Sequence, residues 1–163
     1  MNKMDILLDY LSSEKSLFLA AGIIGIISIV VGMVFLQFQP NYRAFALTML
    51  IIGSIEASVL LTSYFNFPNK AKVQIENFHQ DTEQFRQEQI AVTQSALKSF
   101  FWLKLFYAAL IVVFALLISW LNTKSFFIGI LSALILHLAF AITIDNFGEQ
   151  YTKKYNSELV EKR

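Results

Sequence analysis

Two ionisable side chains lie inside long apolar stretches of this chain, where a charge is costly. Glu56 stands in the uncharged run that follows Arg43, and His137 stands in the run that follows Lys124. The two intervals are equal (56 − 43 = 13 and 137 − 124 = 13 residues) and correspond to about 20 Å of α-helix. A carboxylate and an imidazole at one depth can share a proton or form a hydrogen bond that fixes helix packing. We therefore expect Glu56 and His137 to face each other inside a helix bundle, either as a proton or ion site or as a structural contact.

The stretches that carry these residues have the length and composition of membrane-spanning helices. The chain of 163 residues is 56% hydrophobic and 15% charged, with a mean hydropathy of +0.55. About 20 continuous apolar residues cross the hydrocarbon core as a helix, whereas the strands of a membrane barrel alternate in polarity. The segments that meet the helical criterion are 16–36, 44–65, 101–121 and 125–144. The sequence predicts an all-α membrane protein, a four-transmembrane-helix bundle made of two helical hairpins.

Lysine and arginine indicate how the bundle is oriented. They concentrate in the N-terminal segment, in a central insert at 66–99 and in a tail at 149–163, whereas the short loops hold only Arg43 and Lys124. Because basic residues are retained on the cytoplasmic side, we expect both termini and the insert to be cytoplasmic. The first apolar run is longer than that of a cleaved signal peptide, so we expect it to be retained as a signal anchor.

The central insert has its own helical pattern. Pro68 suits the first turn of a helix, and Asp81 with Thr82 forms a second helix start. One helix or two would fit, and we favour a break near Gln80, with the second piece running into the third span. A narrow apolar stripe runs along the insert, with residues that recur every seven positions at Ala71, Phe78, Phe85 and Val92, and with Ile75 beside them. The stripe either packs on the bundle or the tail, or binds a partner as a helix in a groove.

A second electrostatic pair is expected at the cytoplasmic boundary. Lys104 lies one turn into the third span and Asp145 ends the fourth, so antiparallel packing brings them together. Glu149 is an alternative partner for Lys104. Lysine can also reach the interface unaided, so the pair is expected to be structural.

Catalytic signatures are missing from the sequence. There is no H-E-x-x-H, no G-x-S-x-G, no phosphate-binding glycine loop and no cysteine. The two histidines, His79 and His137, lie in different environments, so we expect no metal site and no cofactor. The net charge of +1 gives no reason to expect nucleic acid as a partner. We expect a non-enzymatic protein whose partners are the lipid bilayer and either a protein toxin or a second copy of the chain.

Two groups of residues carry a resemblance to small bacterial inner-membrane proteins of unassigned role. These proteins have four spans and a cytoplasmic helical insert, and the likeness covers most of the chain. The matching residues are Phe85, Glu88, Val92 and Lys98 before the third span, and Asp145-x-Phe147-x-Glu149 with Tyr155 at the end of the fourth. The chain departs from their pattern at Gln89-Ile90, where Arg-Met is expected. The resemblance implies a bacterial inner-membrane location.

The span count and the cytoplasmic termini are also similar to those of membrane-embedded toxin-immunity proteins. This likeness implies a protein that binds a pore-forming toxin and blocks its insertion or opening. The expected function is therefore toxin immunity. The alternative is a small channel, transporter or accessory subunit that uses the Glu56–His137 pair as a proton or ion site.

Overall fold

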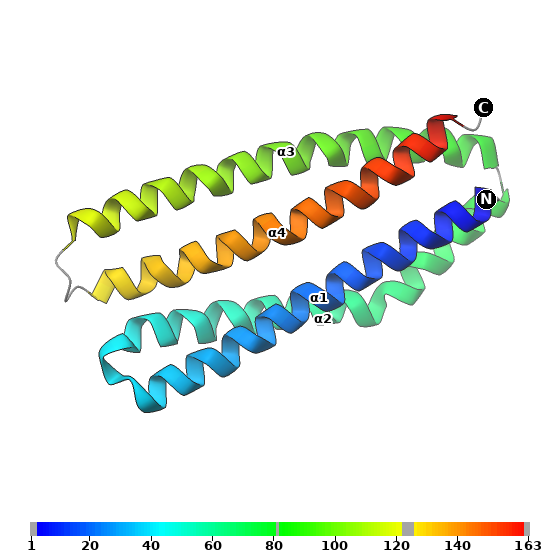
Figure 1. Ribbon diagram of the computed structural model, residues 1–163. Coiled ribbons are helices and arrows are strands. Elements are labelled where there is room, and N and C mark those ends of the chain that lie inside the picture. The colour runs from blue at the N-terminus through cyan, green and yellow to red at the C-terminus, as the bar shows by residue number, and fades with distance from the viewer. Residues whose placement is uncertain (1–2, 81, 122–125, 162–163) are drawn as a thin grey trace.

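The computed structural model describes residues 3–80, 82–121 and 126–161, which are almost entirely helical (Figure 1). The elements are α1 (Lys3–Phe38), the short 3-10 helix η1 (Pro40–Tyr42), α2 (Arg43–Gln80), α3 (Thr82–Trp120) and α4 (Phe126–Glu161). Each of the four α-helices contains an apolar window long enough to cross a membrane. The predicted all-α, four-helix fold is confirmed, and the chain is a multi-pass membrane protein by the length and composition of its helices.

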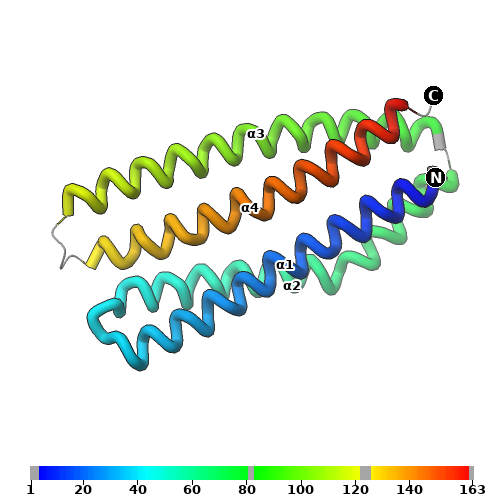
Figure 2. The backbone as a smooth tube through the Cα atoms, in the orientation of Figure 1, coloured from blue at the N-terminus to red at the C-terminus, as the bar shows by residue number. Residues whose placement is uncertain are grey.

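The helices form two antiparallel hairpins that meet along α4. Helix α4 packs against all three other helices, whereas α3 packs chiefly against α4. The start of α1, the end of α2, the start of α3 and the end of α4 lie at one end of the bundle, which we call the terminal end (Figure 2). The η1 turn, the end of α3 and the start of α4 lie at the opposite end, which we call the turn end. The distribution of Lys and Arg predicts that the terminal end is cytoplasmic, and this orientation stays a prediction.

The central insert is not a separate unit but the continuation of two spanning helices. Helix α2 ends at Gln80, where the sequence indicated a break, and α3 begins at Thr82 and continues through the third span. The prediction that Pro68 starts a helix is wrong, because Pro68 lies inside α2. A proline in a helix removes one backbone hydrogen bond, and burial of the neighbouring Phe67 ring helps to hold α2 together through this position. Asp81 lies outside the described residues.

Close backbone contact joins α1 and α2 in the first hairpin. A Cβ atom built on Gly25 would lie 2.6 Å from the backbone nitrogen of Ala57, and one built on Gly53 would lie 2.7 Å from the carbonyl oxygen of Gly25. Only glycine fits at these positions, because any side chain would overlap the facing backbone. Small residues of this kind allow helices to associate in lipid, where lipid tails are as apolar as the helix surfaces.

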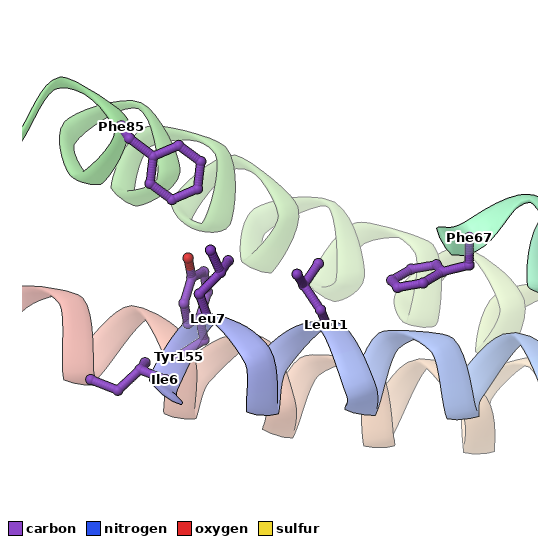
Figure 3. Packing of buried hydrophobic residues seen from close by; sticks show 6 residues of the cluster. All are labelled: Ile6, Leu7, Leu11, Phe67, Phe85 and Tyr155. Atoms are coloured by element: carbon purple, nitrogen blue, oxygen red, sulfur yellow. The ribbon is translucent and has the colours of Figure 1, made fainter. Parts of the chain in front are cut away.

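The helices extend beyond the spans at the terminal end and pack around a core of their own. We call this cluster the terminal-end core, and it is made of Ile6, Leu7, Leu11, Phe67, Phe85 and Tyr155 (Figure 3). The rings of Tyr10 and Tyr155 stack with centroids 4.2 Å apart, and burial raises the pKa of the Tyr155 hydroxyl. All four helices contribute to the core, so it fixes the arrangement of the helices at the terminal end.

Candidate functional site

Glu56 and His137 meet between α2 and α4 within the apolar windows of these helices. The Nδ1 atom of His137 lies 2.9 Å from the Oε1 atom of Glu56. The His137 side chain is 6% exposed and the Glu56 side chain is 29% exposed, so the histidine is the more deeply buried member of the pair. Two residues that lie 81 positions apart in the chain are thus in direct contact at one level of the bundle.

Buried small residues lie one turn or less before each member of the pair. Ala133 precedes His137 by one turn of α4 and is fully buried. Gly53 precedes Glu56 on α2 and is pressed against α1. Helix α2 is therefore held by α1 on one side while it presents the Glu56 carboxylate to α4. The pair thus joins the membrane-spanning parts of the two hairpins.

The second polar atom of each side chain has no hydrogen-bond partner within the described residues. Oε2 of Glu56 and Nε2 of His137 are both buried. When the pair holds one proton on the imidazole and the carboxylate is ionised, the pair carries a net charge of −1. A second proton, on either side chain, brings the net charge to zero. A net charge in the bilayer interior costs at least ~2.5–3.5 kcal/mol, so proton uptake changes the energy of this contact.

A proton suits this pair better than a metal ion does. One carboxylate and one imidazole supply two ligands, whereas zinc sites in proteins use three protein ligands when catalytic and four when structural. Among residues 3–80, 82–121 and 126–161, no group of three or more metal-binding side chains is brought together. A proton needs only one acceptor atom, and the pair offers several.

Lys104 forms its ion pair with Glu149 and not with Asp145. Its ammonium group contacts Oε2 of Glu149 and donates a hydrogen bond of 2.9 Å to Oδ1 of Asn146. The ammonium nitrogen of Lys153 lies 2.8 Å from Oε1 of Glu149, so Glu149 pairs with two lysines. Glu149 lies one turn of α4 beyond Asp145 toward the terminal end, within the reach of a lysine side chain that extends toward the interface. Asn146 was not expected as a partner, because its uncharged amide gives no electrostatic signal in the sequence.

Asp145 is left with a buried Oδ2 atom that has no hydrogen bond within the described residues. The hydrogen bonds from Lys104 and Lys153 lower the pKa of the Glu149 carboxyl. The ionic contact at this boundary therefore centres on Glu149.

The apolar stripe of the insert is mostly covered by the chain itself. Phe85 belongs to the terminal-end core, and Ala71, Ile75 and Phe78 pack against that core. Only Val92 is well exposed, at 59%. The stripe faces inward because the insert helices continue the spanning helices and meet the extended ends of α1 and α4. Of the two alternatives for the stripe, packing within the bundle applies to every member except Val92.

Comparison of the chain with models of protein families, with curated proteins and with solved structures gives no match. The class of protein is therefore defined by its fold alone, a multi-pass membrane bundle of four helices with a polar pair between the hairpins.

Proposed function

We propose that this chain is a non-enzymatic, proton-responsive membrane protein in which Glu56 and His137 form the proton-binding site. The observation that supports this proposal is the 2.9 Å contact between His137 Nδ1 and Glu56 Oε1 within the apolar windows of α2 and α4. The site would serve a small channel, transporter or accessory subunit of the membrane in which the chain resides.

The proposed response follows from the charge of the pair. With its second proton, the pair is neutral and its hydrogen bond links α2 to α4 at little electrostatic cost. Loss of that proton leaves a negative charge between the helices, which favours hydration or separation of α2 from α4. Because this hydrogen bond joins the two hairpins inside the membrane, proton binding biases how the hairpins pack.

Proton flux into liposomes tests the transport form of this function. The purified protein is reconstituted with a pH-sensitive dye inside and a potassium-driven membrane potential. We expect flux in the wild type and loss of flux in Glu56→Gln and in His137→Ala. His79→Ala, which removes an exposed histidine at the terminal end, is the matched control and keeps the flux.

An accessory subunit would bind the proton without carrying it across the membrane. In that form, proton binding to the pair makes the thermal stability of the wild type in detergent depend on pH, and the double variant Glu56→Gln/His137→Ala, which has neither group, lacks this dependence. The proton-site proposal is rejected if the wild type shows no flux and both proteins have the same pH dependence of stability.

As a second candidate function we propose toxin immunity, because α3 leaves its membrane surface open. No described residue in the apolar window of α3 is buried, and α3 packs chiefly against α4. This surface could receive a membrane-inserted segment of a pore-forming toxin and prevent the toxin from assembling. Such binding requires a complementary surface and no catalytic group.

A survival assay distinguishes this function from the first. Cells express a pore-forming toxin encoded beside this gene, together with variants of the chain. We expect Leu116→Trp, on the exposed face of α3, to lose protection, and Ile27→Trp, also exposed on α1, to retain it. Lack of protection by the wild-type chain against every neighbouring toxin would remove this candidate.

A further inference from the structure

A pocket of about 930 Å³ opens at the turn end, where the two hairpins meet. One wall comes from the end of α1, from η1 and from the first turn of α2, and the other comes from the first two turns of α4. A Cβ atom built on Gly129 of α4 would lie 2.7 Å from the backbone nitrogen of Phe45, so the backbones of α4 and α2 touch beside the pocket. The residues that the proposal uses are Phe35, Asn41, Tyr42, Arg43, Phe45 and Ser132.

Arg43 brings a positive charge to this pocket that no carboxylate of the chain can neutralise. The sequence contains no Asp or Glu between Glu14 and Glu56, or between Glu88 and Asp145. The acidic residue nearest to Arg43 along α2 is therefore Glu56, about 20 Å deeper, and it is bound to His137. Arg43 is exposed, and a guanidinium group is a strong bidentate partner for phosphate, so this position can bind an anion from outside the chain.

The other walls of the pocket are apolar and aromatic. The ring of Phe35 packs against Phe45 with centroids 5.3 Å apart and against Tyr42 at 6.1 Å. Aromatic rings beside a basic residue at the end of a spanning helix are typical of the level at which lipid headgroups meet acyl chains. Asn41 and Ser132 add hydrogen-bonding groups to the same pocket. The combination suits a molecule that has a phosphate at one end and hydrocarbon at the other.

We propose that this pocket binds one anionic phospholipid from the leaflet at the turn end, with Arg43 holding the phosphate and the aromatic walls receiving the upper part of an acyl chain. A zwitterionic lipid carries its own cation beside the phosphate and therefore gains less from Arg43. A bound lipid here contacts both hairpins and fills the space between them.

Native mass spectrometry of the full-length protein tests this proposal. The protein is released from micelles that contain equal amounts of phosphatidylglycerol and phosphatidylcholine with the same acyl chains, and the retained lipids are counted. We expect the wild type to retain phosphatidylglycerol in preference to phosphatidylcholine. Arg43→Gln should lower that preference about fivefold, the factor expected for one basic residue near anionic lipid. Lys72→Gln, which removes an exposed cation at the terminal end, is the matched control and keeps the preference.

Two further measurements distinguish a bound lipid from a free phosphate ion and from a folding defect. Inorganic phosphate at millimolar concentration should not displace phosphatidylglycerol, because it cannot use the apolar walls, whereas Phe45→Ala should weaken retention. Arg43→Lys keeps the charge and should retain most of the preference. This result would show that the loss in Arg43→Gln comes from the missing charge and not from a folding defect. Equal retention of the two lipids by the wild type, an unchanged preference in Arg43→Gln, or displacement by inorganic phosphate would each overturn the proposal.

Discussion

Glu149 forms ion pairs with two lysines at the predicted cytoplasmic boundary. Lys104 and Lys153 both pair with it, and the hydrogen bond from Lys104 is the largest cause of its lowered pKa. A carboxyl whose pKa is lower in the folded state than its ordinary value of 4.5 stabilises the fold above that pH. This contribution is lost as the pH falls from about 4.5 through the lowered value.

Replacement of Glu149 should therefore change the acid sensitivity of the protein. We expect Glu149→Gln to melt at a lower temperature than the wild type at pH 7 and to lose less stability between pH 5 and pH 3. Thermal unfolding in detergent, followed by circular dichroism, provides the measurement. Glu161→Gln removes an exposed carboxylate at the end of α4 and should behave like the wild type at each pH. Parallel pH profiles for Glu149→Gln and the wild type would contradict this prediction.

Some of these contacts could be predicted from the sequence and others could not. Helical rise alone places Glu56 and His137 at one depth, because each is counted from a basic residue at a membrane boundary. The partner of Lys104 depends instead on where a flexible side chain of four carbons extends. That reach exceeds one turn of α4, so sequence spacing does not distinguish Asp145 from Glu149.

At the scale of the element, α1 and α2 depend on glycine at their crossing. A leucine at Gly53 would force its Cβ against the backbone of Gly25, whereas a leucine at the adjacent Ser54 would extend from an exposed position. We expect Gly53→Leu to lower the free energy of unfolding by about 1–3 kcal/mol, the usual cost of overpacking, and Ser54→Leu to have little effect. Steric trapping or thermal unfolding in detergent measures both variants. Equal stability of the two variants would show that the hairpin tolerates separation at this crossing.

The course of α2 shows where local sequence signals fail. Pro68 after an apolar span has the pattern of a helix start, yet α2 continues through it to Gln80. The signal describes what proline prefers in isolation, whereas the continuation depends on contacts with α1. Lys70 pairs with Glu14, and Phe67 packs against the ring of Phe18 on α1. These partners lie far away in the sequence, so a local pattern does not reveal them.

At the scale of the whole molecule, the terminal-end core should contribute much of the stability. Phe85 is buried in this core and lies on the same stripe as the exposed Val92. We expect Phe85→Ala to cost about 3–5 kcal/mol, as for other buried phenylalanines, and Val92→Ala to cost far less. Chemical denaturation in detergent measures the difference. If Val92→Ala destabilises the protein as much as Phe85→Ala does, Val92 is covered by a partner or a second copy.

The orientation of the bundle can be tested directly because the sequence contains no cysteine. Single cysteines are placed at exposed positions of the terminal end, with Ser12→Cys and Ser95→Cys, and of the turn end, with Asn41→Cys. If the terminal end is cytoplasmic, a membrane-impermeant maleimide should label only Asn41→Cys in intact cells, and all three after lysis. Labelling of Ser12→Cys in intact cells would reverse the orientation predicted from Lys and Arg.

The continuity of α4 links the membrane pair to the terminal-end core. His137 and Tyr155 are separated by 18 residues (155 − 137), which is five turns of α-helix, so the two side chains leave α4 on the same face about 27 Å apart. His137 contacts Glu56 on α2, and Tyr155 stacks on Tyr10 of α1. A rotation of α4 about its own axis that separates the first contact also separates the second. We therefore expect a rotation of α4 at His137 to disturb the tyrosine stack at the terminal end as well.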